Sequence, residues 1–258
     1  MCTFKIDGFI LRTTLESDYS ARIAFITRPI GRLNLIARRL KYPGNPVGPL
    51  MTFSLDRLLV RRIPDSAALR IEELEVIEAF PRLSEEYQRF VCGSYIAELL
   101  IRAIPERSPC PELYDLIGPA LRCLSECRDP RSIAFAVELN ILSALGYSPS
   151  FTRCVGCNAP LAEKGDYQFS IGAGGILCPE CLKNERTGIA EADCFSLSAG
   201  AAAFARMSLC KRAEQLKGAS VSKGLGRELF RLLRSYKAYH LQIESNSAEL
   251  LGALVSRA

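Results

Sequence analysis

The chain has 258 residues, of which 48% are hydrophobic, and this content supports a packed core and excludes global disorder. No apolar run approaches the roughly 18 residues that a membrane-spanning helix needs. Eleven cysteines, an odd number, occur in a sequence without a cleavable N-terminal signal pattern. These features predict a soluble protein of a reducing cytoplasm rather than a secreted, disulfide-linked one.

The net charge of +5 conceals a division of charge along the chain. Residues 1–64 carry 11 Lys/Arg against 4 Asp/Glu, whereas residues 65–205 carry 12 against 20. Residues 206–237 are basic again, with 9 Lys/Arg against 2 Asp/Glu. Two basic segments around an acidic middle indicate a polyanionic partner that is bound at particular surfaces, and the alternative is that these faces are only solvated.

The first 80 residues have the pattern of β-structure. Short runs rich in β-branched and aromatic residues are separated by turn signals, and they cover 7–13, 20–28, 32–38, 50–62 and 69–78. Pro29-Ile30-Gly31 predicts a hairpin turn between the second and third runs. Five short strands in this length are typical of a small closed barrel, for which the OB-fold is the five-stranded example.

Strand alternation places basic residues on one face of the predicted hairpin. Arg22 and Arg28 share a face of one strand, and Arg32 and Arg38 share a face of the next, opposite Leu33 and Leu35. The basic run continues into a Pro/Gly-rich loop at 42–49. A basic loop beside a small barrel suits a phosphate backbone, whereas the alternative is a solvated face. The candidate DNA-binding residues here are Arg22, Arg28, Arg32, Arg38, Arg39 and Lys41.

From about residue 84 the apolar period becomes helical. Ser84 is the expected N-cap of a first helix that ends at Pro105, and a second follows Pro111, with Gly118-Pro119 expected to kink or split it. Asp129 and Pro130 predict the start of a third helix, which closes at Gly146. An Ala-rich helical segment follows Ser196 and Ser198.

A last helix is predicted near 222–243, with an apolar stripe roughly opposite a basic one. The apolar stripe is expected to pack on the other helices while the basic stripe faces solvent. The basic stripe is either a solvated surface or a second nucleic-acid contact. Its members are Lys223, Arg227, Arg231 and Arg234.

Two C-x2-C pairs, Cys154/Cys157 and Cys178/Cys181, are separated by 20 residues, a spacing typical of zinc sites. Two residues between cysteines let a tight turn direct both thiolates to one ion, and the second pair completes a tetrahedron. Four thiolates leave no position for water, so the predicted Zn²⁺ is structural. A redox dithiol is the alternative, but it favours one such pair within a βαβ pattern, whereas these surroundings are Gly-rich and predicted to be poor in strands.

Several segments in the same order resemble the RecO family of bacterial DNA repair and recombination mediators, and the resemblance covers nearly the whole chain. They are T-R-P-I-G-R-L (27–33), I-P-E-R-S-P-C-P-E-L-Y-D-L (104–116), V-E-L-N-I-L-S-A-L-G-Y-S-P (137–149), the first cysteine pair, G-G-I-L-C-P-E-C (174–181) and L-L-R-S-Y-K-A-Y-H-L (232–241). Each segment is weak evidence alone, but six in this order are specific.

The resemblance implies an α+β protein with an N-terminal OB-fold and a helical domain that carries an inserted four-Cys zinc knuckle. The expected domains are 1–80 (OB-fold, DNA-binding), 81–150 and 185–258 (helical), and 151–184 (knuckle). It also implies binding of single- and double-stranded DNA, annealing of complementary strands, and help, with RecR, in loading RecA on DNA coated by single-strand-binding protein (SSB). Such a protein would be cytoplasmic and associated with the nucleoid.

The resemblance further implies a pocket for the acidic C-terminal tail of SSB. Near its expected position this chain has Ala136-Val137, where the family often has a basic residue and Phe. Arg128 and Arg131 are the candidates for supplying positive charge there instead.

Two other classes of function remain as alternatives. An enzyme is disfavoured, because His240 is the sole histidine, no P-loop occurs, and no His/Asp/Glu cluster provides an open metal site. A protein-binding zinc adaptor without DNA binding is the other alternative, for which the acidic middle would serve.

Overall fold

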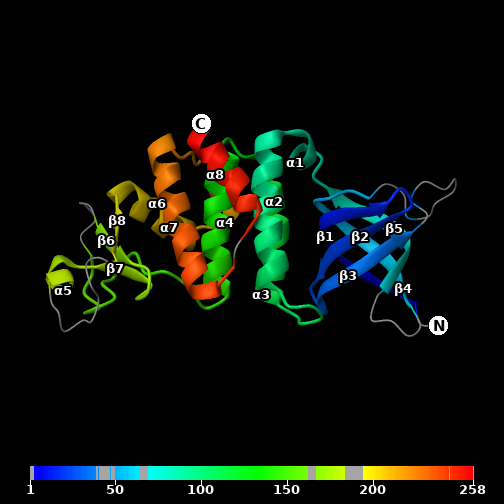
Figure 1. The fold of residues 1–258 in the computed structure, drawn as a ribbon, viewed down its shortest axis with the longest axis horizontal. Helices are drawn as coiled ribbons and strands as arrows, with labels where there is room; N and C mark the ends of the chain where they lie inside the picture. The colour runs from blue at the N-terminus through cyan, green and yellow to red at the C-terminus, as the bar shows by residue number, and fades with distance from the viewer. Residues whose placement is uncertain are drawn as a thin grey trace. The chain divides into compact units, whose positions relative to one another are not determined.

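The computed structural model describes residues 3–38, 40, 47, 50–63, 69–161, 167–183, 194–243 and 245–257 (Figure 1). The chain divides into two compact units, Met1–Ser125 and Glu126–Ala258. The first unit holds a barrel and the helices that follow it, and the second holds further helices and the cysteine-rich segment.

The N-terminal strands form a closed barrel with the order β1-β2-β3-β5-β4. Neighbouring strands are antiparallel except β3 and β5, which pair in parallel through Leu35 with Leu69 and Ile36 with Arg70. A five-stranded barrel of this order confirms the predicted OB-fold. The strands are β1 (Thr3–Ser17), β2 (Ser20–Thr27), β3 (Gly31–Arg38), β4 (Ser54–Arg62) and β5 (Leu69–Ala79).

The interior of the barrel follows the predicted alternation. Ile23 and Phe25 of β2 pair with Leu35 and Leu33 of β3, and all four side chains belong to one buried cluster. The hairpin turn ends at Gly31, whose φ is +82° and whose missing Cβ would lie 1.9 Å from the Ser108 carbonyl oxygen. Only glycine fits this left-handed conformation and close contact, so the hairpin end packs directly on the segment after α2.

The helices of the first unit begin and end differently from the predictions in two places. They are α1 (Arg82–Glu85), α2 (Tyr87–Ala103) and α3 (Pro111–Glu126). Ser84 lies inside α1 and is not a cap; Glu86 is extended and precedes α2, and its carboxylate accepts bonds from Arg82 and Arg89. The helix α3 is not split at Pro119, because buried residues on both sides of the proline hold it in place.

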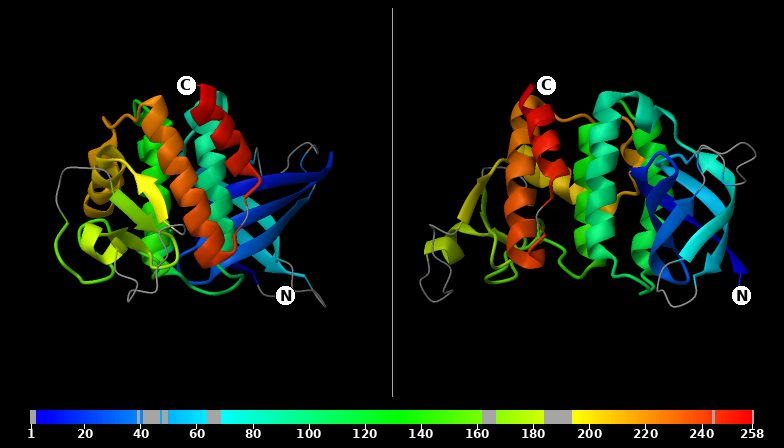
Figure 2. Two further views of the ribbon diagram at one scale, coloured as in Figure 1. Left: turned by 60° about the vertical axis from the view of Figure 1, so that its left-hand side comes forward. Right: turned by 45° about the vertical axis from the view of Figure 1, so that its right-hand side comes forward.

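The helices of the second unit are α4 (Pro130–Ala144), α5 (Pro179–Lys183), α6 (Ala199–Cys210), α7 (Lys223–Leu241) and α8 (Ser247–Arg257), with a 3₁₀ turn at Ala213–Leu216. Asp129 caps α4, as predicted, while Ser198 caps α6 and Ser222 caps α7. The helix α4 packs on α6 and α7, and α7 runs beside α8 (Figure 2). The helix α8 is not apparent from the sequence pattern.

The cysteine-rich segment contains a small sheet that the sequence analysis does not predict. Its order is β7-β6-β8, formed by Gly175–Leu177, Tyr167–Ser170 and Cys194–Leu197. Strands of three or four residues give too short a pattern to be recognised against a Gly-rich background. Across the described part of the chain, no helix combines the length and the hydropathy needed to cross a membrane.

Candidate metal centre and basic surfaces

The two cysteine pairs meet in space as predicted. The Sγ atoms of Cys154, Cys157, Cys178 and Cys181 all lie within 4.8 Å of one another, and the Sγ atoms of Cys157 and Cys178 are 3.8 Å apart. A tetrahedral Zn²⁺ with bonds of about 2.3 Å requires sulfurs about 3.8 Å apart. The sulfur positions therefore fit a four-coordinate metal ion.

Local backbone amides support thiolates in this cluster. The amides of Gly156 and Cys178 donate to Cys154 Sγ at 3.3 and 3.2 Å, and the Cys181 amide donates to Cys178 Sγ at 3.4 Å. Burial alone raises the pKa of the Cys154 thiol, but the amides of Cys178, Cys157 and Gly156 outweigh it and bring that pKa to about 6. Ionised sulfur is the form that binds metal.

The surroundings of the cluster leave little space beside the sulfurs. A Cβ on Gly156 would lie 3.0 Å from Cys181 Sγ, and Leu177 packs with Cys154 and Cys181 in a small buried cluster. If the four sulfurs bind one ion, no coordination position is left for a substrate. The arrangement is therefore that of a structural metal site, which would stabilise the knuckle, rather than a catalytic centre.

Three of the candidate barrel arginines are engaged within the first unit. Arg22 pairs with Glu16 at 2.6 Å. Arg28 forms a two-pronged pair with Asp115 at 3.0 and 3.1 Å, which lowers the pKa of that carboxyl group. Arg32 donates from Nε to the Ile104 carbonyl at 3.0 Å and is half-buried. Arg32 thus fixes the hairpin to the end of α2, while Arg22 and Arg28 keep exposed guanidinium groups.

Arg38, at the end of β3, differs from the other described candidates on the barrel in its lack of a partner among the described residues. Its side chain is exposed, and no ion pair or hydrogen bond joins it to another described residue. Arg39 and Lys41 lie outside the residues that the structure describes.

The four basic residues of α7 share its exposed side, while Leu229, Leu232 and Tyr236 are buried. Arg227 Nη2 donates to the Ser256 carbonyl at 3.3 Å, and the Arg231 guanidinium lies 4.9 Å from the centre of the Phe195 ring. Within the described residues, none of the three arginines of α7 is paired with a carboxylate. Ion pairs with described residues therefore do not neutralise the positive charge of these arginines.

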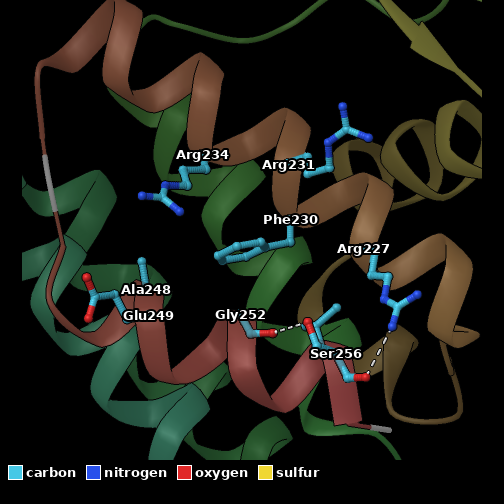
Figure 3. A pocket seen from close by; sticks show the side chains of 9 residues that line it. Arg227, Phe230, Arg231, Arg234, Ala248, Glu249, Gly252 and Ser256 are labelled. Carbon is cyan, nitrogen blue, oxygen red and sulfur yellow. Dashed lines mark hydrogen bonds between the residues drawn. The ribbon is translucent and has the colours of Figure 1, made fainter.

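Three arginines of α7 also line a pocket that the sequence analysis does not predict, because it depends on α8. The pocket has a volume of about 440 Å³, and its other lining residues include Phe230, Glu249 and Gly252 (Figure 3). Phe230 lies in the last helix predicted from the sequence, whereas Gly252 lies in α8, and only the fold brings the two helices side by side.

The two arginines suggested for an acidic peptide tail differ in their surroundings. Arg131 is buried to 12% exposure of its side chain and holds Asp129 through two bonds of 2.9 and 3.0 Å. Its Nη2 also donates to the Val221 carbonyl at 3.2 Å. Arg128 is exposed, and its backbone amide donates to Lys217. Arg131 thus serves the α4 cap, and only Arg128 presents its charge to solvent.

Comparisons with known proteins agree over much of the chain. A family model described as "Recombination protein O C terminal" matches residues 84–249, from α1 into α8. This range includes the cysteine cluster and the basic stripe of α7.

Curated relatives named "DNA repair protein RecO" are similar to this chain over two thirds of its length or more. A protein of Symbiobacterium thermophilum is 30% identical over 186 residues, covering 70% of this chain and 72% of the relative. One of Exiguobacterium sibiricum is 32% identical over 178 residues, or 67% and 68% of the two chains. One of an Anaeromyxobacter species is 30% identical over 240 residues and covers 92% of this chain and 91% of the relative, so that likeness extends into the barrel.

Proposed function

This chain belongs to the RecO family of DNA repair proteins, and from that premise we propose that it is a mediator of repair and recombination that acts without catalysis. It binds single- and double-stranded DNA, anneals complementary strands and, with RecR, helps load RecA on DNA covered by SSB. The family match over residues 84–249 carries this proposal.

Two basic surfaces are proposed to bind DNA. The first is the OB-fold domain of residues 1–80, where Arg38 is open to solvent and Arg22 and Arg28 carry exposed guanidinium groups beside their carboxylate partners. The second is the stripe of α7, Lys223 with the three arginines, which has no carboxylate partner in the described residues. Phosphates bind such surfaces with an affinity that falls steeply as salt rises.

The remaining domains are proposed to support these surfaces. Residues 81–150 and 185–258 are proposed as the helical domain, except that β8 pairs with β6 of the knuckle, and the four cysteines are proposed to hold a structural Zn²⁺ in the knuckle of residues 151–184. The fit of the sulfur positions to a tetrahedron supports zinc. Arg128, exposed beside the start of α4, is proposed as a contact for the acidic tail of SSB.

The test is annealing of complementary strands that carry SSB, measured with and without RecR. Annealing faster than the spontaneous rate, with loss of activity at high salt, is expected. A chain that binds neither single strands nor duplexes in a gel shift at low salt would contradict the proposal and favour the protein-binding zinc adaptor.

A second assay separates the mediator from an enzyme. Labelled single strands and duplexes are incubated with the protein and Mg²⁺, Mn²⁺ or Zn²⁺, and intact DNA is expected throughout. Cleavage that copurifies with the protein would contradict the non-catalytic assignment.

A further inference from the structure

The pocket between α7 and α8 combines positive charge with an apolar surface. Figure 3 shows the Phe230 ring in the space between the two helices, with Arg234 toward one end and Arg227 toward the other. The ring packs on Gly252, where a Cβ would lie 2.9 Å from Phe230 Cζ, so glycine admits the ring between the helices. The volume of the pocket, about 440 Å³, is within the range of small-ligand sites.

The charges of the pocket are arranged asymmetrically. Arg227, Arg231 and Arg234 all come from α7, whereas Glu249 comes from α8. Glu249 is exposed, and no ion pair between it and these arginines occurs in the described structure. A ligand that places negative charge along α7 and an uncharged part with N–H donors toward α8 satisfies both walls.

We propose that this pocket binds one nucleotide unit of single-stranded DNA, with the phosphate on Arg234 and the base against Phe230. The inference rests on the proposed function and gives the basic stripe of α7 a specific task. A nucleotide carries its charge on the phosphate alone, and its base has an uncharged face that stacks on aromatic rings. An acidic peptide, with carboxylates along its length, would bring negative charge to Glu249 as well.

The proposal distinguishes single strands from duplexes at this surface. In a duplex each base is stacked and paired, so placing one in the pocket requires unpairing it at a cost. Duplex DNA then contacts only the arginines, while a single strand gains the aromatic contact in addition. We therefore expect α7 to prefer single strands.

The first experiment changes charge at the pocket and elsewhere. Binding of an oligo(dT) strand to the full chain is measured across salt concentrations for Arg234→Glu and for Lys211→Glu. Lys211 is an exposed basic residue of the same unit that does not line the pocket. Arg234→Glu is expected to weaken binding about 5-fold or more and to reduce the salt slope by about 1, with the control within about 2-fold of the unchanged chain. Equal losses in both variants would overturn the proposal.

The second experiment removes the aromatic ring while keeping an apolar side chain. Phe230→Leu is expected to weaken oligo(dT) binding about 5-fold or more with an unchanged salt slope, because no phosphate contact is lost. An abasic strand of the same length is expected to bind the variant and the unchanged chain equally. If Phe230→Leu weakens binding of the abasic strand as much as it weakens binding of oligo(dT), the assignment of the base to Phe230 is overturned. Melting curves that match the unchanged chain show that the variant is folded.

Competition experiments identify the source of the nucleotide. Free dTMP that displaces oligo(dT) from the unchanged chain, but less from Phe230→Leu, supports a nucleotide pocket that also accepts monomers. Polyglutamate is tested as a competitor at equal charge concentration. If it displaces oligo(dT) from the unchanged chain and from Phe230→Leu but not from Arg234→Glu, the proposal is overturned in favour of an acidic peptide. Wild-type affinity in both pocket variants refutes only this inference, whereas failure of the unchanged chain to bind DNA refutes the proposed function.

Discussion

Asp56 is a carboxylic acid inside the barrel wall. Its exposed fraction is 1%, Ser54 Oγ donates to its Oδ2 at 2.6 Å, and its Oδ1 has no hydrogen-bond partner in the described structure. Burial raises the pKa of Asp56 to about 6, although the bond from Ser54 opposes the shift. The folded barrel therefore favours the neutral acid.

Replacing Asp56 with Asn is expected to stabilise the protein at pH 8 but not at pH 4. The pKa of Asp56 is higher in the folded state than in the unfolded one. The contribution of Asp56 to the free energy of unfolding is therefore complete below pH 3.8 and is lost as pH rises through about 6. This rise in the pKa of Asp56 corresponds to a change of at most about 3 kcal/mol in the free energy of unfolding. Urea unfolding at the two pH values measures the difference, and an equal effect at both would contradict the assignment.

Arg38 and Arg32 lie on the same face of β3 but are expected to respond differently to replacement by Glu. Arg38→Glu should weaken DNA binding and leave the melting temperature unchanged, because its side chain is exposed and makes no ion pair or hydrogen bond with other described residues. Arg32→Glu should lower stability by about 1–3 kcal/mol, since it removes the bond to the Ile104 carbonyl. Thermal melting measures the stability of both variants, and a gel shift measures their DNA binding. The same melting temperature and the same DNA affinity in both variants would contradict this prediction.

At the scale of the element, the start of α4 concentrates several bonds on one carboxylate. Asp129 accepts from the amides of Arg131 and Val221, both at 3.0 Å, and from the Arg131 guanidinium. Burial raises the pKa of Asp129, but Arg131 and the Val221 amide more than offset this and lower it overall. The cap therefore joins α4 to the segment before α7.

Asp129→Ala is expected to destabilise the second unit by about 3 kcal/mol, because it leaves the buried Arg131 guanidinium unpaired. In the unchanged chain the pKa of Asp129 is lower when folded, so this stability is present above pH 3.8 and is lost as pH falls through the folded value. Denaturation at pH 7 measures the loss. Asp129→Asn retains a cap and should show a smaller effect; an equal effect would assign the loss to the ion pair rather than the cap.

The sequence predicts elements best where a local pattern is long or where a cap is chemically distinct. The strands β2 and β3, the Asp129 cap and the cysteine pairs all meet this condition. The prediction at Ser84 was wrong because Glu86, two residues later, interrupts the helix with an extended backbone. The small sheet of the knuckle has strands too short for periodicity to reveal.

At the scale of the whole molecule, the cysteine cluster lies in only one of the two compact units. If the proposed Zn²⁺ is bound, replacing Cys154 and Cys178 with Ala is expected to abolish metal binding and to speed hydrogen exchange across β6, β7 and β8, because metal binding contributes to the folding free energy. Amides in the barrel should keep their protection. Unchanged metal content by mass spectrometry would contradict the zinc assignment.

Contacts between distant parts of the chain are the features that the sequence conceals. Arg28 and Asp115 are 87 residues apart, and nothing in either local pattern indicates that they pair. The pocket of α7 and α8 likewise depends on tertiary packing of Phe230 against Gly252. Periodicity identifies the exposed basic face of α7, but not the concave surface beside it.

The parallel pairing of β3 with β5 has a consequence for folding kinetics. Among the described residues it joins two residue pairs, whereas the β2–β3 hairpin joins eight within a short stretch of sequence. Closing the barrel at this junction brings together residues far apart in the sequence for few backbone contacts, which makes it a slow, late event on the folding pathway. We expect local unfolding of the cylinder to begin at this junction, while the hairpin nucleates early.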